Sequence, residues 1–162
     1  MANSAGNGNE YGYSLAGTEE LHKAISDYYV NTYGITLQQS QEVLMLMGSQ
    51  DGLVHLPMVF ANPGDYILVP DPGYTAYATG IAMAGAVPYL MPLQKKKMTF
   101  FQTYRLFQRM LQKRSKLMIL NFPGNPVPAM ANDVFFSLKS LLFAKQYNII
   151  VVHDFAYGEL YF

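Results

Sequence analysis

The stretch "NIIVVHDFAYGELYF", residues 148–162, closes the sequence. Its four consecutive β-branched residues are typical of a strand that is buried on both faces, and Asp154 follows them almost directly. A carboxylate at the tip of such a strand is largely desolvated, so it needs a cation or several hydrogen-bond donors. The stretch therefore predicts a parallel sheet and a partner for Asp154 at the carboxyl end of its last strand.

Short apolar runs alternate with helix-length segments through the rest of the chain. Strands are predicted at residues 42–47, 66–70, 87–91, 116–122 and 148–154, and helices at 50–61, 74–84 and 131–147. An earlier helix begins after Thr18, a good N-cap, and ends at Gly34. The alternation favours an α/β fold with three layers, in which helices flank a largely parallel sheet and the crossovers are right-handed.

The composition is that of one globular domain. The 162 residues are 51% hydrophobic and 14% charged, and we expect residues 1–12 to be disordered and 13–162 to form the domain. A formal net charge of zero gives no argument for nucleic acid. There is no cysteine, no signal peptide and no apolar run of membrane-spanning length. We therefore expect a cytoplasmic protein without a nucleic-acid, membrane or metal partner.

Sheets of this kind bind ligands at the carboxyl ends of their strands, so the residues there are candidates for a site. Gly48, Ser49 and Gln50 form a turn into a helix, whose free N–H groups and hydroxyl suit a phosphate. A plain glycine turn with a serine N-cap is the alternative for these residues. Tyr74 follows a rigid Pro- and Gly-containing loop and could lie flat on a planar ring, or serve as ordinary rim packing.

The last two strands contribute the remaining candidates. Asn125, held between Gly and Pro, could donate to a phenolic oxygen or act as an Asx-turn residue. Asp154 could keep a ring nitrogen protonated, or cap the segment after it, and Tyr157 could reach the same ligand. His153 alternates away from Asp154 and suits packing. Together the candidates specify a phosphate cup, a stacking ring, a phenolate donor and an anion, which match pyridoxal phosphate.

The motifs in their order along the chain resemble the class I/II, fold-type-I aminotransferase family. They are "YGYSLAGTEELHKAI" (11–25), "MGSQDGL" (47–53), "NPGDYILVPDPGYTAY" (62–77), "AGAVPYLMPL" (84–93), "LNFPGNP" (120–126) and "VVHDFAYGELYF" (151–162). The branch that includes LL-diaminopimelate, alanine and aromatic aminotransferases is the most similar. The resemblance implies transfer of an amino group between an amino acid and a 2-oxo acid by a homodimer that carries pyridoxal phosphate.

The resemblance also assigns roles to the candidates. Gly48, Ser49 and Gln50 match the phosphate-binding turn, and Tyr74 matches the aromatic residue that stacks on the pyridine ring. Asn125 and Tyr157 match the groups that hydrogen-bond the phenolic oxygen, and Asp154 matches the partner of the pyridine nitrogen. Tyr11 or Tyr13 matches a tyrosine that reaches the phosphate in the neighbouring subunit.

Two features depart from the family pattern. The family's Schiff-base lysine lies a few dozen residues beyond the aspartate, and the small C-terminal domain follows it; neither is matched here, so we expect a fragment of the large domain that has no catalytic residue and is inactive alone. Residues 94–116 hold eight of the eleven Lys and Arg residues and no acid. This stretch, atypical over 95–114, is interpreted as a frameshift product, a solvated helix or a functional basic helix.

Two other classes of function stay open. A C–S lyase or a decarboxylase would use the same pyridinium chemistry, and a non-catalytic binding fragment would use the basic stretch instead.

Overall fold

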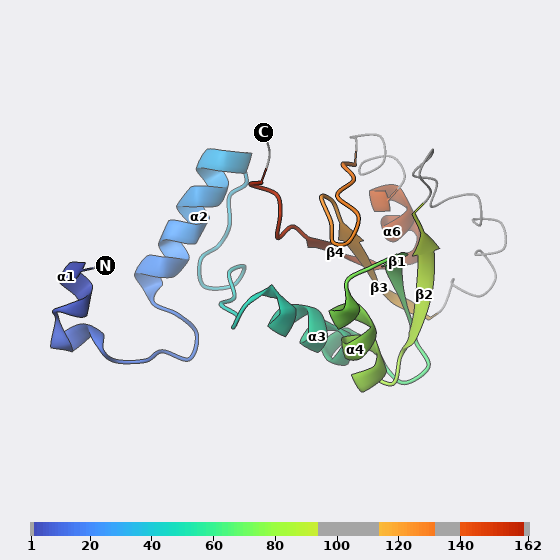
Figure 1. Cartoon of the computed structure of the whole chain (residues 1–162), viewed down its shortest axis with the longest axis horizontal. Helices are drawn as coiled ribbons and strands as arrows, with labels where there is room; N and C mark the ends of the chain where they lie inside the picture. Colours follow the sequence, from blue (N-terminus) through green and yellow to red (C-terminus); the bar gives the residue numbers. More distant parts are fainter. Residues whose placement is uncertain (1, 94–113, 132–139, 161–162) are drawn as a thin grey trace. The chain divides into compact units, whose positions relative to one another are not determined.

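The computed structural model describes residues 2–93, 114–131 and 140–160 (Figure 1). The chain divides into two compact units, Met1–Leu46 and Met47–Phe162, which are described separately. The basic stretch falls outside the described residues except for its last three positions, so its three interpretations stay predictions.

The first unit is built around helix α2, Glu19–Tyr33. The Thr18 hydroxyl accepts the backbone N–H of Leu21 at 3.3 Å, and Gly34 ends the helix in the left-handed region with φ 68°. Both predicted ends of this helix are confirmed. Ahead of it, helix α1 covers Ala2–Ala5 and the 3-10 turn η1 covers Gly8–Glu10.

The disorder expected for residues 1–12 stays a prediction, although two short elements are described there. Each of the two elements is a single turn, and the described residues in this segment are exposed. The Asn7 side chain stabilises η1 by accepting the backbone N–H of Asn9 at 3.2 Å. Local capping of this kind can form a turn that buries no apolar surface.

The strand predicted at residues 42–47 is wrong. The segment contains no strand residues, and Leu44 and Met47 are 77% and 91% exposed. An apolar run becomes a strand only when a neighbouring strand pairs with its backbone, and none of the four described strands does so. The boundary between the two units also falls within this run, after Leu46.

The second unit contains a parallel sheet of four described strands, all of them predicted. They are β1, Tyr66–Asp71; β2, Val87–Pro92; β3, Ser115–Asn121; and β4, Ile150–Asp154. Their order in the sheet is β2-β1-β3-β4. All neighbouring pairs are parallel, and the register places Asn121 beside Asp154 at the ends of β3 and β4.

Helices cover both faces of the sheet, which confirms the three-layer α/β prediction. Helices α3, Ser49–Phe60, and α4, Thr75–Met83, lie on one face, and α6, Leu142–Tyr147, lies on the other (Figure 1). Of the predicted helix at 131–147, residues 132–139 lie outside the described residues, residue 131 is not helical, and α6 covers the C-terminal end. No helix in the described parts of the chain is both long and apolar enough to span a bilayer.

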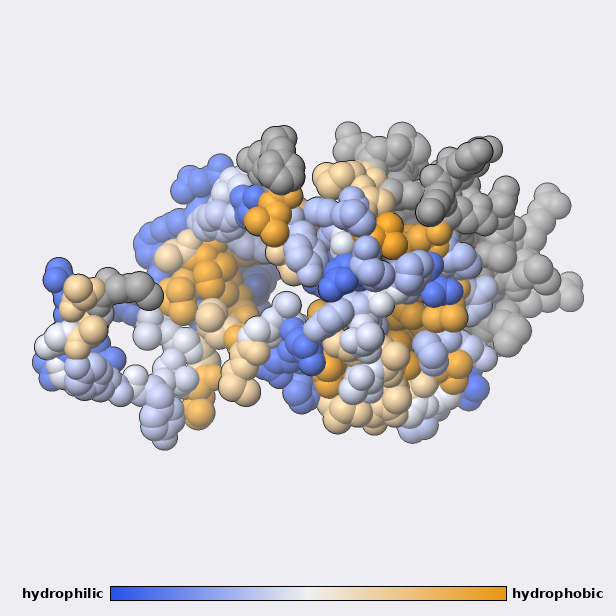
Figure 2. Space-filling view, viewed as in Figure 1, coloured by the Kyte–Doolittle hydropathy of each residue, from blue (hydrophilic) through white to orange (hydrophobic). Residues whose placement is uncertain are grey.

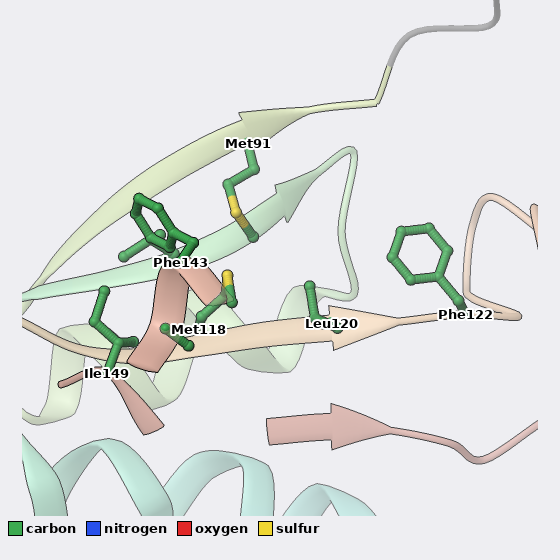
Figure 3. Close-up of a cluster of buried hydrophobic side chains, with 8 residues drawn as sticks. Met91, Met118, Leu120, Phe122, Phe143 and Ile149 are labelled. Carbon is green, nitrogen blue, oxygen red and sulfur yellow. The ribbon is translucent and has the colours of Figure 1, made fainter. Parts of the chain in front are cut away.

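Side chains alternate between two cores because successive residues of a strand face opposite sides. From β3, Leu117 and Ile119 join a cluster with α3 and α4 that also contains Tyr77 and Ile81. Met118 and Leu120 of β3 face the other side, where they pack with α6. This second cluster contains Leu68, Met91, Met118, Leu120, Phe122, Phe143, Ala144 and Ile149 (Figure 3). Burial on both faces is why β1 and β3 read as continuous apolar runs.

The strand order also determines where a site can form. From β1 the chain crosses by α4 to β2 on one side, whereas from β3 it continues to β4 on the other side. The connections therefore diverge between β1 and β3, and a crevice opens at the carboxyl ends of strands at such a point. The residues that follow β1, β3 and β4 meet there.

Candidate functional site

A cavity of about 170 Å³ lies at this carboxyl edge of the sheet. It is lined by Ser49, Tyr74, Asn121, Asn125, Asp154, Ala156 and Tyr157. Five of the seven residues predicted to bind a cofactor are in this lining, although they come from segments more than a hundred residues apart in sequence. The other two, Gly48 and Gln50, are next to Ser49 in the chain and are not in the lining.

The turn before α3 has the geometry that the sequence predicted. Gly48 adopts φ 83°, a backbone conformation that residues with a Cβ rarely adopt. Ser49 is the first residue of the 12-residue helix. The Asp51 carboxylate accepts the backbone N–H of Met47 at 3.2 Å, which fixes the turn from the helix side. The hydroxyl of Ser49 and the first N–H groups of α3 are therefore available at the rim of the cavity.

Asp154 also lines the cavity and is only 9% exposed. The Tyr77 hydroxyl donates to its Oδ2 at 2.6 Å. Among the described residues no donor is recorded for Oδ1, the second oxygen. Oδ1 is not one of the fully buried side-chain atoms that lack a partner, so it is open to a cationic or donating ligand in the cavity.

Two residues that contact Asp154 were missed by sequence reasoning. They are Tyr77 and Asn121. The carbonyl oxygens of Pro123 and Asp154 lie 3.0 and 3.3 Å from one end of the Asn121 side-chain amide, so that end is its NH₂ group. The amide oxygen then faces the Tyr77 hydroxyl at 2.8 Å. The only signals in the sequence were that Asn121 ends a strand and that Tyr77 follows Tyr74 by three residues, one helical turn.

Tyr77 remains a protonated donor in this network. Its side chain is 1% exposed, and burial, followed by the hydrogen bond to Asp154, raises the pKa of the phenol well above its ordinary value of 10. A neutral hydroxyl is what a carboxylate acceptor requires, because a phenolate beside Asp154 would place two negative charges together. The Tyr77 hydroxyl therefore stays available as the donor to Asp154.

Tyr74 forms one wall of the cavity and is fixed at two points. Its hydroxyl donates to the side-chain Oε1 of Gln50 at 2.8 Å. Its ring packs edge-on against Tyr77, with centroids 5.9 Å apart and an interplanar angle of 86°. Both contacts restrict the rotation of the tyrosine ring, so its position is set by α3 on one side and by α4 on the other.

Asn125, Tyr157 and His153 complete the strand ends. Asn125 is exposed, Tyr157 is 36% exposed, and both line the cavity. His153 is not in the lining, as the alternation along β4 predicts; its Nε2–H donates to the carbonyl oxygen of Phe122 at 3.1 Å. Partial burial lowers the pKa of His153 below its ordinary value of 6.5.

The chain belongs to the family of class I and II aminotransferases, whose model matches residues 2–162. It is 40% identical over 149 residues to an LL-diaminopimelate aminotransferase of Desulforudis audaxviator, covering 92% of this chain and 38% of that protein. It is 43% identical over 149 residues to the L-glutamine--4-(methylsulfanyl)-2-oxobutanoate aminotransferase of Bacillus subtilis, covering 92% and 37%.

Among solved structures, apo-BacF from Bacillus subtilis superposes with a TM-score of 0.86 at 38% identity, over 97% of this chain and 40% of that one. The chain thus spans 37–40% of the length of these relatives. Members of this family depend on pyridoxal phosphate. The donor set fits that group: hydroxyl and helix N–H groups suit its phosphate, and a buried carboxylate suits its ring nitrogen.

Proposed function

We propose that this chain is the cofactor-binding part of a pyridoxal-phosphate-dependent aminotransferase, which transfers an amino group between an amino acid and a 2-oxo acid. One observation carries the proposal. Asp154, buried at the end of β4, holds one carboxylate oxygen on Tyr77, and no donor is recorded for the other among the described residues. A protonated ring nitrogen would satisfy it as both donor and cation.

Five of the seven lining residues have a defined part in this proposal. The Ser49 hydroxyl and the first N–H groups of α3 bind the phosphate, and the Tyr74 ring covers one face of the cofactor. Asn125 and Tyr157 donate to the phenolic oxygen, and Asp154 keeps a proton on the ring nitrogen. When bound, the cofactor supplies an electron-accepting ring that stabilises negative charge at the α-carbon of the substrate.

Turnover needs groups that these residues do not supply. The described lysines are Lys23, Lys116 and Lys145, and none is in the cavity lining. A base is required to move the α-proton, and the family uses a lysine for which the 162 residues contain no matching motif. We therefore propose that the chain binds the cofactor but turns over substrate only when further sequence of the family is supplied.

Two parts of the proposal, the substrates and a homodimer, rest on family resemblance. The relatives' names include LL-diaminopimelate and 4-(methylsulfanyl)-2-oxobutanoate, and this chain's own amino donor and acceptor are left open between such substrates. A homodimer and a cytoplasmic location stay predictions that the described residues do not test.

The proposal is tested by titrating the 162-residue chain with pyridoxal phosphate, followed by protein-observed NMR or equilibrium dialysis. We expect Asp154→Asn, which keeps the shape and removes the charge, to weaken binding at least tenfold because the ring nitrogen loses its anion. Asp27→Asn removes an exposed carboxylate from the first unit and should bind as the parent chain does. Equal affinity for the parent and the Asp154→Asn variant would refute the proposal.

A further inference from the structure

Gln50 is in the turn that the sequence assigns to phosphate, yet its side chain points elsewhere. Ser49 lines the cavity and Gln50 does not. The side-chain Oε1 of Gln50 instead accepts the Tyr74 hydroxyl at 2.8 Å, from a residue 24 positions later in the chain. The contact joins the first turn of α3 to the residue that precedes α4.

The hydrogen bond fixes Oε1 of the Gln50 side chain on the Tyr74 hydroxyl, and Gln50 is absent from the cavity lining. A tyrosine ring attached only at its Cα can rotate about χ1 and χ2, so a ring that must lie against a flat ligand needs a second anchor. The edge contact with Tyr77 restricts one side of the Tyr74 ring, and the hydrogen bond to Gln50 restricts its far end. Tyr74 is half-buried whereas Gln50 is exposed, so Gln50 holds the tyrosine from outside the cavity.

We propose that the side chain of Gln50 is a positioning residue for Tyr74 and not a phosphate ligand. Its backbone N–H, at the second position of α3, is its only contribution to the anion site. The inference rests on the proposed function because it concerns how the same cavity holds a pyridoxal ring. It predicts that Gln50 acts on ring affinity through the Tyr74 hydroxyl and leaves phosphate affinity unchanged.

The first test compares three probes on the 162-residue chain: pyridoxal phosphate, pyridoxal and inorganic phosphate. We expect Gln50→Ala to weaken the binding of pyridoxal phosphate and of pyridoxal by the same factor, about threefold for one partly exposed hydrogen bond. Inorganic phosphate should bind Gln50→Ala as well as it binds the parent chain. Weaker binding of pyridoxal phosphate and phosphate with unchanged binding of pyridoxal would mark Gln50 as a phosphate ligand and overturn the inference.

The second test needs no ligand. In a double-mutant cycle on urea unfolding, Gln50→Ala should lower the folding equilibrium constant about threefold in the parent chain and leave it unchanged in the Tyr74→Phe background. Gln50→Glu, whose carboxylate can still accept the tyrosine hydroxyl, should retain the coupling and the parent affinity for pyridoxal. Additive effects of Gln50→Ala and Tyr74→Phe would overturn the inference.

A control variant and the pattern of results separate a failure of the inference from a failure of the proposed function. Gln41→Ala removes an exposed glutamine side chain in the other unit and should change neither measurement. If neither pyridoxal compound binds the parent chain, the proposed function fails, and the ligand-free cycle still decides the role of Gln50. If the compounds bind and the cycle shows no coupling, the inference about Gln50 fails and the proposed function stands.

Discussion

At the scale of single residues, the hydroxyl of Tyr77 determines how Asp154 is presented. The hydroxyl donates to Oδ2 of Asp154 at 2.6 Å, and the amide of Asn121 lies beside both groups. Because the raised pKa of Tyr77 keeps the phenol neutral, the carboxylate has a fixed orientation and its second oxygen is left for a ligand.

Removing this hydroxyl should cost stability as well as function. Tyr77→Phe leaves the Oδ2 oxygen of Asp154 without its donor and removes the hydroxyl that contacts the Asn121 amide, so we expect the free energy of unfolding to fall by about 1–3 kcal/mol. Urea denaturation measures this loss, and Tyr13→Phe, at a tyrosine that is 92% exposed, is the matched control. A Tyr77→Phe variant as stable as the parent chain would show that the network contributes nothing.

His153 should give the chain a pH-dependent stability. Because its pKa in the folded state lies below the ordinary value of 6.5, the unfolded chain binds more protons between the two values. The stability associated with His153 is therefore fully present above pH 6.5 and is lost as the pH falls from 6.5 through the lower pKa of the folded state. The urea midpoint measured above pH 6.5 and the one measured below it should differ less in His153→Gln than in the parent chain. An equal difference in both proteins would contradict this expectation.

At the scale of elements, α4 connects the site to the sheet. Tyr74 is its N-cap residue, and Tyr77, one turn later, reaches Asp154 at the end of β4. The helix packs closely against α3, because a Cβ added to Gly80 would lie 2.7 Å from the carbonyl oxygen of Val54. The distance between these two helices therefore depends on a glycine.

Gly80→Ala tests this close approach. Alanine is the better helix former by about 1 kcal/mol, but its methyl group would collide with the backbone of α3, so we expect a net loss of about 1–3 kcal/mol in unfolding free energy. Thr79→Ala, at the exposed neighbouring position, should be neutral or slightly stabilising. Thermal or urea unfolding of both variants measures the difference, and a stabilised Gly80→Ala would mean that α3 and α4 have room to separate.

The elements that could be predicted from the sequence are those whose burial leaves a local pattern. Strands β1 and β3 read as apolar runs because both faces are covered, and Thr18 and Gly34 mark the ends of α2 by local chemistry. The run at 42–47 has the same composition, but pairing depends on a neighbour that the local sequence does not reveal. The hydrogen bond between Tyr77 and Asp154 joins residues 77 positions apart, so no local sequence pattern predicts it.

At the scale of the whole molecule, hydrophobic side chains remain on the surface. Val30 of α2 is 45% exposed, and hydrophobic surface is visible over this helix in the space-filling view (Figure 2). At the two outer strands of the described sheet, Leu90 of β2 and Ile150 of β4 are 53% and 44% exposed. Outer strands that carry apolar side chains promote association.

We therefore expect the isolated 162-residue chain to self-associate or to bind a hydrophobic dye. Sedimentation velocity over a range of concentrations should show species larger than a monomer, because apolar side chains and strand edges gain by being covered. Replacing Leu90 and Ile150 together by lysine should shift the distribution towards monomer. A parent chain that stays monomeric at every concentration and binds no dye would contradict this expectation.

The most direct measurement of the central claim is the protonation state of the ring nitrogen of bound pyridoxal phosphate, observed by NMR with the nitrogen isotopically labelled. At mildly alkaline pH, the buried Asp154 carboxylate should keep this nitrogen protonated in the parent chain, and Asp154→Asn should leave it neutral. The same nitrogen shift in both proteins would mean that Asp154 does not face the ring, and the account of this site would be wrong.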